Sequence, residues 1–152
     1  MHRVMVLMKA ILAGWIGTVV LTLSETVEMK LTGREASTVP GQVGSKVFGI
    51  QTTNQEALHR LSTQVHWGHG VLMGSLRGVL CLFGLSRLGA TGIHYALVWG
   101  GDALLYAALG IAPLPWKWKR QELITDLFHK GMYALATGIA FDLLTTSERQ
   151  KD

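Results

Sequence analysis

Residues 65–80 read VHWGHGVLMGSLRGVL, and the spacing of the glycines in this stretch decides how the rest of the chain is interpreted. Gly70, Gly74 and Gly78 recur every four residues, so on a helix they form one stripe of small residues. His66 lies on the same stripe, one turn earlier. Small residues at this spacing let two helix backbones approach closely in lipid. The stretch therefore predicts a membrane-spanning helix that packs against a neighbour through its glycines.

The composition of the whole chain also favours a membrane protein. Hydrophobic residues make up 49% of the 152 residues and charged residues only 16%, whereas soluble proteins carry about 25% charged residues. Apolar segments at about 4–31, 61–85, 91–111 and 124–144 each have close to the ~20 residues that cross a bilayer. We therefore expect an all-α polytopic membrane protein, in which residues 1–152 form a single transmembrane domain built as a four-transmembrane-helix bundle.

The polar loop at residues 32–60 is expected to contain one short surface helix, over about residues 40–48, because a proline suits the first turn of a helix. Further along, Thr53 and Glu56 have the spacing of a capping box. This spacing predicts that the next long helix begins near Asn54.

Four spans place both chain termini on one side of the membrane, together with the loop around Arg87. The opposite side holds the polar loop 32–60 and the loop at residues 116–120. With Lys9 and Lys30, near the two ends of the first segment, included, five basic residues fall on the first side and seven fall on the second. The positive-inside rule leans toward a cytoplasmic second side, but the margin is small and the orientation stays open.

Three pairs of polar side chains fall where three spans meet the second side. Each pair is spaced i, i+3, so its members share a helix face. The pairs are Glu25 and Glu28, His66 and His69, and Asp126 and His129. Carboxylates and imidazoles together suit divalent metals such as zinc, manganese or iron. The pattern predicts that these residues converge, as ligands of a metal or haem or as a hydrogen-bonded network without a cofactor. Polar groups at span ends can also simply face headgroups and water.

A second set of ionisable residues lies inside apolar sequence, toward the first side: Arg77, His94, Asp102 and Asp142. An unpaired arginine in the bilayer centre costs about 3 kcal/mol or more. Arg77 is therefore expected to pair with Asp102 or Asp142. Such a pair can fix helix packing or take part in a proton relay.

Motifs of several common enzyme classes are missing from the sequence, which has no phosphate loop, GxSxG, CxxC or HExxH. No basic run is long enough to predict nucleic-acid binding. Lys117 and Lys119 alternate with tryptophans, a pattern typical of anchors at lipid headgroups. The expected partners are the lipid bilayer and either a larger membrane complex or further copies of this chain.

Three stretches carry a resemblance to known proteins: GTVVLTLSETVEMKLTGREASTVPGQ at 17–42, VHWGHGVLMGSLRGVL at 65–80 and ELITDLFHKGMYALATGIAFDLL at 122–144. They resemble a group of small bacterial four-span membrane proteins over about residues 13–144. The resemblance implies a multi-pass fold in a bacterial cytoplasmic membrane and no particular activity. In that group tyrosine often stands at the position of His69, which favours the other five residues as ligands.

Four functions are compatible with these patterns. The first is an accessory or scaffold membrane protein, whose polar network locks the bundle and offers a docking surface. The others are a metal- or haem-holding protein, a proton-coupled transporter or channel that uses both clusters, and a membrane enzyme with a metal-bound water. The first is favoured because four helices leave little room for alternating access, and the inverted repeats common in transporters are not visible.

Overall fold

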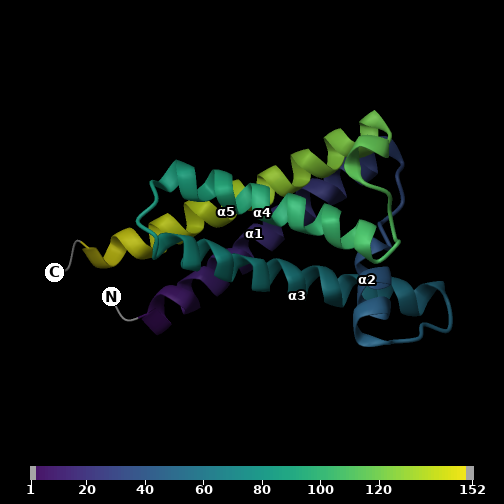
Figure 1. Cartoon of the computed structure of the whole chain (residues 1–152), viewed down its shortest axis with the longest axis horizontal. Coiled ribbons are helices and arrows are strands. Elements are labelled where there is room, and N and C mark those ends of the chain that lie inside the picture. The colour runs from purple at the N-terminus through teal and green to yellow at the C-terminus, as the bar shows by residue number, and fades with distance from the viewer. Residues whose placement is uncertain (1–2, 150–152) are drawn as a thin grey trace.

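The computed structural model describes residues 3–149, and this part of the chain is all-α (Figure 1). Its four long helices are α1 (Arg3–Thr32), α3 (Gln55–Cys81), α4 (Arg87–Ala108) and α5 (Arg120–Arg149). The short helix α2 (Val39–Phe48) lies in the first connection, and a 3-10 turn, η1 (Pro115–Lys117), lies in the last. The expected all-α fold is confirmed, including the short helix in the polar loop.

The first connection is bounded by residues suited to helix ends. α1 stops before Gly33, which has a φ of +71°, a conformation that glycine adopts without a steric penalty. The predicted start of a long helix near Asn54 is confirmed, because α3 begins at Gln55, but Thr53 and Glu56 do not form the predicted capping box. Asn54 caps this helix, because its side-chain oxygen accepts a 2.8 Å hydrogen bond from the Ala57 amide. Glu56 pairs with Arg60 on the helix surface instead.

Most of the other helix ends differ from the apolar segments by three to five residues. α3 ends at Cys81, before residue 85, because a turn that includes Gly84 at φ +68° follows it. α4 begins at Arg87, before residue 91, because the Ser86 hydroxyl accepts a 3.1 Å hydrogen bond from the Gly89 amide. Capping chemistry, and not the edge of the apolar sequence, sets these ends.

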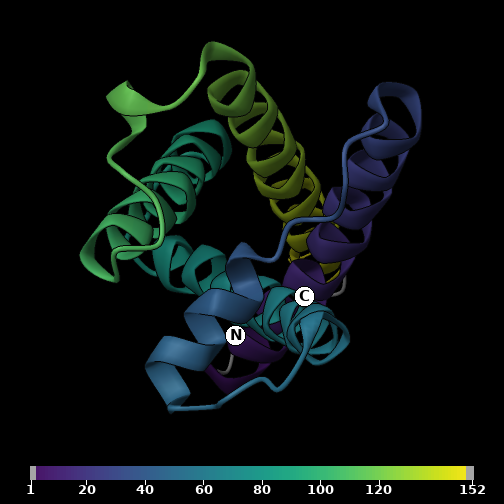
Figure 2. The ribbon, with the colours of Figure 1, turned by 90° about the vertical axis from the view of Figure 1, so that its right-hand side faces the viewer.

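The long helices run back and forth along one axis (Figure 1). The start of α1, the end of α5 and the turn between α3 and α4 lie at one end of the molecule. The connection that contains α2 and the connection between α4 and α5 lie at the opposite end, which we call the α2 end. Viewed from the α2 end, the four long helices surround a common centre, with α2 beside the first turns of α3 (Figure 2). The Gly41 amide donates a 2.8 Å hydrogen bond to Ser62 Oγ and fixes α2 there.

The glycine stripe of α3 faces α1. A Cβ added to Gly78 would lie 2.7 Å from the Cβ of Ala10, and one added to Gly74 would lie 2.6 Å from the carbonyl oxygen of Ala10. A Cβ on Gly70 would overlap the side chain of Thr18. The stripe therefore meets a matching row of small residues, spaced by four, on the antiparallel α1. This close contact fixes the position of α3 along the axis of α1.

Polar residues occupy the inside of the bundle, and large apolar residues cover its outside. Arg77 is 2% exposed and His94 is fully buried, whereas Met8 and Leu143 are 64% and 68% exposed. Exposed large apolar side chains occur on each of the four long helices. By length and hydropathy, one of the described helices, α1 from Val4 to Thr32, is a candidate membrane span. Core helices of soluble proteins pass the same test, so this helix alone is weak evidence for a membrane protein.

Candidate functional site

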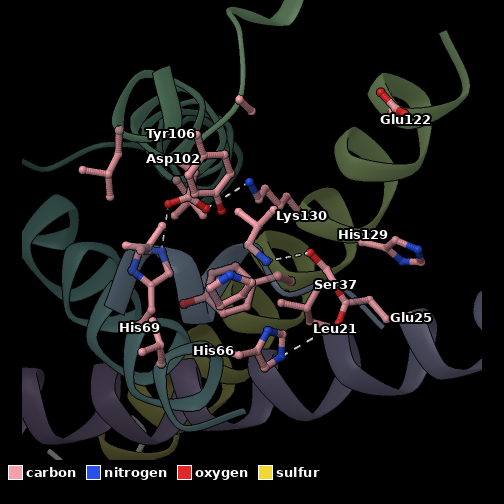
Figure 3. A pocket seen from close by; sticks show the side chains of 18 of the residues that line it. Leu21, Glu25, Ser37, His66, His69, Asp102, Tyr106, Glu122, His129 and Lys130 are labelled. Atoms are coloured by element: carbon pink, nitrogen blue, oxygen red, sulfur yellow. Dashed lines mark hydrogen bonds and ion pairs between the residues drawn. The ribbon is translucent and has the colours of Figure 1, made fainter. Parts of the chain in front are cut away.

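A cavity of about 590 Å³ lies between the long helices at the α2 end. Six ionisable side chains of its wall lie inside the bundle and come from all four long helices (Figure 3): Glu25, His66, His69, Asp102, His129 and Lys130. Lys117, Lys119 and Glu122 also line the cavity, and these three are exposed. Much of the remaining wall is apolar, with Leu21, Val65 and Val98 among its residues. An apolar concave space of this size with a few polar groups is typical of small-molecule sites, which span roughly 300–1,000 Å³.

Asp102 on α4 is the centre of the most polar part of the wall. Its Oδ1 lies 2.9 Å from His69 Nε2, and its Oδ2 lies 3.0 Å from Lys130 Nζ. The same ammonium group lies 3.3 Å from Asp126 Oδ1, one helical turn earlier on α5. Lys130 is only 9% exposed and has a carboxylate on two sides. The fold therefore compensates this buried cation with two anions, as a buried charge requires.

His66 on α3 is oriented by α1. The Thr22 hydroxyl donates its one proton to the Thr18 carbonyl oxygen at 2.8 Å. His66 Nε2 lies 3.0 Å from the same hydroxyl oxygen, so Nε2 must carry the hydrogen in this contact. The distance from His66 Nε2 to Glu25 Oε2 is 4.0 Å, which is an ionic contact and too long for a hydrogen bond.

His129 on α5 is oriented by α1 in the same manner. Its Nδ1 lies 2.8 Å from Ser24 Oγ, and that hydroxyl donates to the Leu21 carbonyl oxygen at 2.8 Å. The hydroxyl proton is therefore in use, and Nδ1 carries the hydrogen. His129 Nε2 lies 3.8 Å from Glu28 Oε2, beyond hydrogen-bond distance. Glu28 instead accepts two hydrogen bonds from Arg34, at 2.6 and 2.9 Å.

The residues expected to share one ligand gather at the α2 end but meet different partners. Glu25 is near His66, Glu28 pairs with Arg34, and Asp126 pairs with Lys130. Within the described residues, no group of three or more His, Cys, Asp or Glu side chains is arranged to hold a metal ion. These residues thus lie toward the same end of the bundle, as the sequence predicts. Their convergence on one centre is not seen, because each helix turns its two polar residues toward different neighbours.

The second cluster contains one pair of the expected kind. Arg77 Nη2 lies 2.7 Å from Asp142 Oδ1, and the guanidinium also lies 4.8 Å from the centre of the Phe141 ring. His94 takes no part in this ion pair. Its Nε2 donates a 3.0 Å hydrogen bond to the Met73 carbonyl oxygen.

The assignment of Asp102 to the second cluster was wrong, because Asp102 belongs to the cavity. Arg77 follows His69 by eight residues, and His94 precedes Asp102 by eight residues in the antiparallel α4. At 1.5 Å per residue, each separation is about 12 Å along the bundle. Asp102 therefore lies level with His69 in the cavity wall, while Arg77 and His94 lie deeper in the bundle.

Sequence reasoning missed two residues that define the cavity. Lys130 was overlooked, although its spacing of four from Asp126 indicates an ion pair on one helix face. Tyr133 has no comparable signal. Its side chain is buried in the wall, and its hydroxyl donates a 2.6 Å hydrogen bond to the carbonyl oxygen of Gly70. That carbonyl belongs to the glycine stripe, so Tyr133 joins α5 to the α1–α3 contact.

Comparisons of the chain with protein-family models, curated proteins and solved structures find no match. Inferences about function therefore rest on the cavity, on its wall and on the distribution of polar residues in the bundle.

Proposed function

We propose that this protein is a four-span integral membrane protein that binds a small molecule in the cavity at the α2 end, in an accessory role. The observation that carries the proposal is the 590 Å³ cavity with the Lys130–Asp102–His69 network in its wall. Ionisable groups in a membrane bundle are functional-site candidates by default, because each is costly to place there.

The surface of the bundle supports the membrane location. The shortest long helix, α4, has 22 residues, which corresponds to about 33 Å of helix against about 30 Å of hydrocarbon. Large apolar side chains are exposed on all four long helices, whereas soluble proteins rarely expose large contiguous apolar patches. In the middle of α3, α4 and α5, ionisable residues such as Arg77, His94 and Lys130 are buried. They lower the mean hydropathy of these helices without exposing charge to lipid.

The shape of the cavity favours binding over conduction. Residues of the two connections, including Ser37 and Lys117, line the cavity at the α2 end. Gly70 and Tyr133 line it farther inside the bundle, where their hydrogen bond joins two helices. Still deeper, Arg77 and His94 are fully packed. The cavity lining thus includes residues of the α2 end and not the buried Arg77 and His94, as expected for a binding site and not for a continuous path through the bundle.

Single cysteines introduced in a Cys81→Ala background test this proposal. Leu21→Cys places a thiol in the cavity wall, and Leu135→Cys places one on the apolar outer surface of α5. In sealed membrane vesicles, a water-soluble thiol reagent is expected to label Leu21→Cys from one side only and to leave Leu135→Cys unlabelled. Rapid labelling of Leu135→Cys would contradict the membrane location. An unreactive Leu21→Cys would contradict a cavity that water and ligand can enter.

A further inference from the structure

The charges in and directly behind the cavity wall do not balance. Apart from Lys117, Lys119 and Glu122, which line the cavity but are exposed, three carboxylates, Glu25, Asp102 and Asp126, accompany the single ammonium group of Lys130. Lys130 lies within 3.3 Å of both Asp102 and Asp126, so its charge is shared by these two. The contact of Glu25 with His66 is 4.0 Å long. Of these three carboxylates, Glu25 is therefore the one without an ammonium or guanidinium group within 4.0 Å among the described residues.

A second acceptor without a partner is buried behind the wall on the same side of the cavity. His129 is 3% exposed and lines the cavity, and its Nδ1 holds the hydrogen bonded to Ser24. In the neutral ring Nε2 is then an acceptor, and among the described residues it has no hydrogen-bond partner. Its neighbour at 3.8 Å, Glu28 Oε2, is an acceptor as well. Figure 3 shows His129 and Glu25 on one side of the cavity, opposite His69 and Asp102.

The size and the apolar part of the wall describe the rest of the ligand. A bare inorganic ion would fill little of the 590 Å³. Leu21, Val65 and Leu105 offer apolar surface, and the rings of Tyr106 and Trp118 also line the space. Aromatic faces attract cations as well as apolar groups. The exposed lysines of the η1 loop stand at the mouth in contact with solvent, which screens their charge.

We infer that the cavity binds a protonated organic amine with an apolar body, whose ammonium group meets Glu25 on the side of the cavity where His129 lies. A primary ammonium has three hydrogens to donate, which suits a carboxylate without a donor of its own. An acidic ligand is disfavoured, because Lys130 is already shared between two carboxylates. This inference rests on the proposed function and specifies the class of ligand.

Three probes of one shape test the inference: 4-phenylbutylamine, 4-phenylbutanol and 4-phenylbutyrate, which are cationic, neutral and anionic. Each is titrated calorimetrically at pH 8 into the full chain in phosphatidylcholine nanodiscs, with empty nanodiscs subtracted. The amine is expected to bind about tenfold more tightly than the alcohol, and the acid most weakly, because hydrogen bonds to charged groups contribute more than neutral ones. Glu25→Gln should remove this preference for the amine and leave the alcohol unchanged.

Two further variants distinguish a failure of the amine inference from a failure of the proposed binding function. Glu56→Gln changes an exposed carboxylate at the start of α3 and should leave all three affinities unchanged. Leu21→Trp fills part of the cavity and should weaken all three. Equal binding of the three probes, or strongest binding of the acid, would overturn the amine inference. The same holds if Glu25→Gln leaves binding of the amine unchanged while Leu21→Trp weakens it. In each of these cases the proposal of a binding cavity stands. If no probe binds and Leu21→Cys is also unreactive, the proposed function fails too.

Discussion

Gly14 of α1 and Gly74 of α3 lie backbone against backbone: a Cβ added to Gly14 would lie 2.7 Å from Gly74 Cα and 2.8 Å from the Val71 carbonyl oxygen. Neither position leaves room for a side chain. One turn farther toward the α2 end, Thr18 meets Gly70 in the same stripe. The approach of these two backbones thus sets the alignment of α1 and α3, and with it the hydrogen bond between Thr22 and His66 in the cavity region.

Gly74→Ala should destabilise the bundle, because the added methyl group meets the backbone of α1, which cannot move aside as a flexible side chain could. Overpacking of this kind costs about 1–3 kcal/mol. The thermal midpoint of the purified protein in detergent measures the effect. Gly68→Ala is the matched control, since Gly68 is on the same helix and a Cβ there meets nothing within 4 Å. Equal midpoints for the two variants would show that the stripe is not a tight contact.

Arg77→Leu should destabilise the protein strongly, by about 3–5 kcal/mol, because it leaves Asp142 without its partner inside the bundle. Combining it with Asp142→Asn should recover part of the loss, with a coupling of about 1–3 kcal/mol. The comparison is made by thermal or denaturant unfolding in detergent micelles. Combining Arg77→Leu with Asp102→Asn should instead give additive effects, because the Asp102 oxygens contact His69 and Lys130. Strong coupling to Asp102 would contradict the pairing.

The sequence predicted the position of each polar residue along the bundle axis better than it predicted which neighbouring helix the side chain faces. Glycine spacing identified the face of α3 that meets α1, since small residues spaced by four have one main use in a bundle. The burial of Arg77 required a carboxylate, but two were available. The helical rise argues against Asp102 as the partner of Arg77, since Asp102 lies level with His69, and Arg77 follows His69 by eight residues.

The cavity could not be derived from the sequence in the same manner. It depends on how far the helices diverge at the α2 end, and on the rotation of α5, which carries Lys130 into the space between Asp102 and Asp126. Apolar residues surround each polar pair on α1, α3 and α5, so no single inward face can be read from the pattern. For this reason Glu25, His66 and Asp126 were placed at the right level but assigned to one shared centre.

Lys130→Met should destabilise the protein by about 3–5 kcal/mol, because Asp102 and Asp126 would face each other without the cation that separates them. Adding Asp102→Asn to Lys130→Met should restore part of the stability, since one of the two stranded charges is removed. Unfolding midpoints of the two single variants and the double variant measure this coupling. Lys119→Met is a suitable control, because Lys119 is exposed in the loop before α5. Purely additive losses would contradict the network.

Tyr133→Phe should lower stability by about 1 kcal/mol, the usual contribution of one buried hydrogen bond, because the Gly70 carbonyl oxygen loses the hydroxyl that donates to it at 2.6 Å. Tyr95→Phe removes a comparable 3.0 Å hydrogen bond to the Leu127 carbonyl oxygen, outside the cavity wall, and serves as the control. Both variants should lower the unfolding midpoint, but only Tyr133→Phe should change the labelling rate of Leu21→Cys, because Tyr133 helps to hold α5 against the α1–α3 contact beside the cavity. Equal labelling rates in the two variants would show that Tyr133 stabilises the bundle without shaping the cavity.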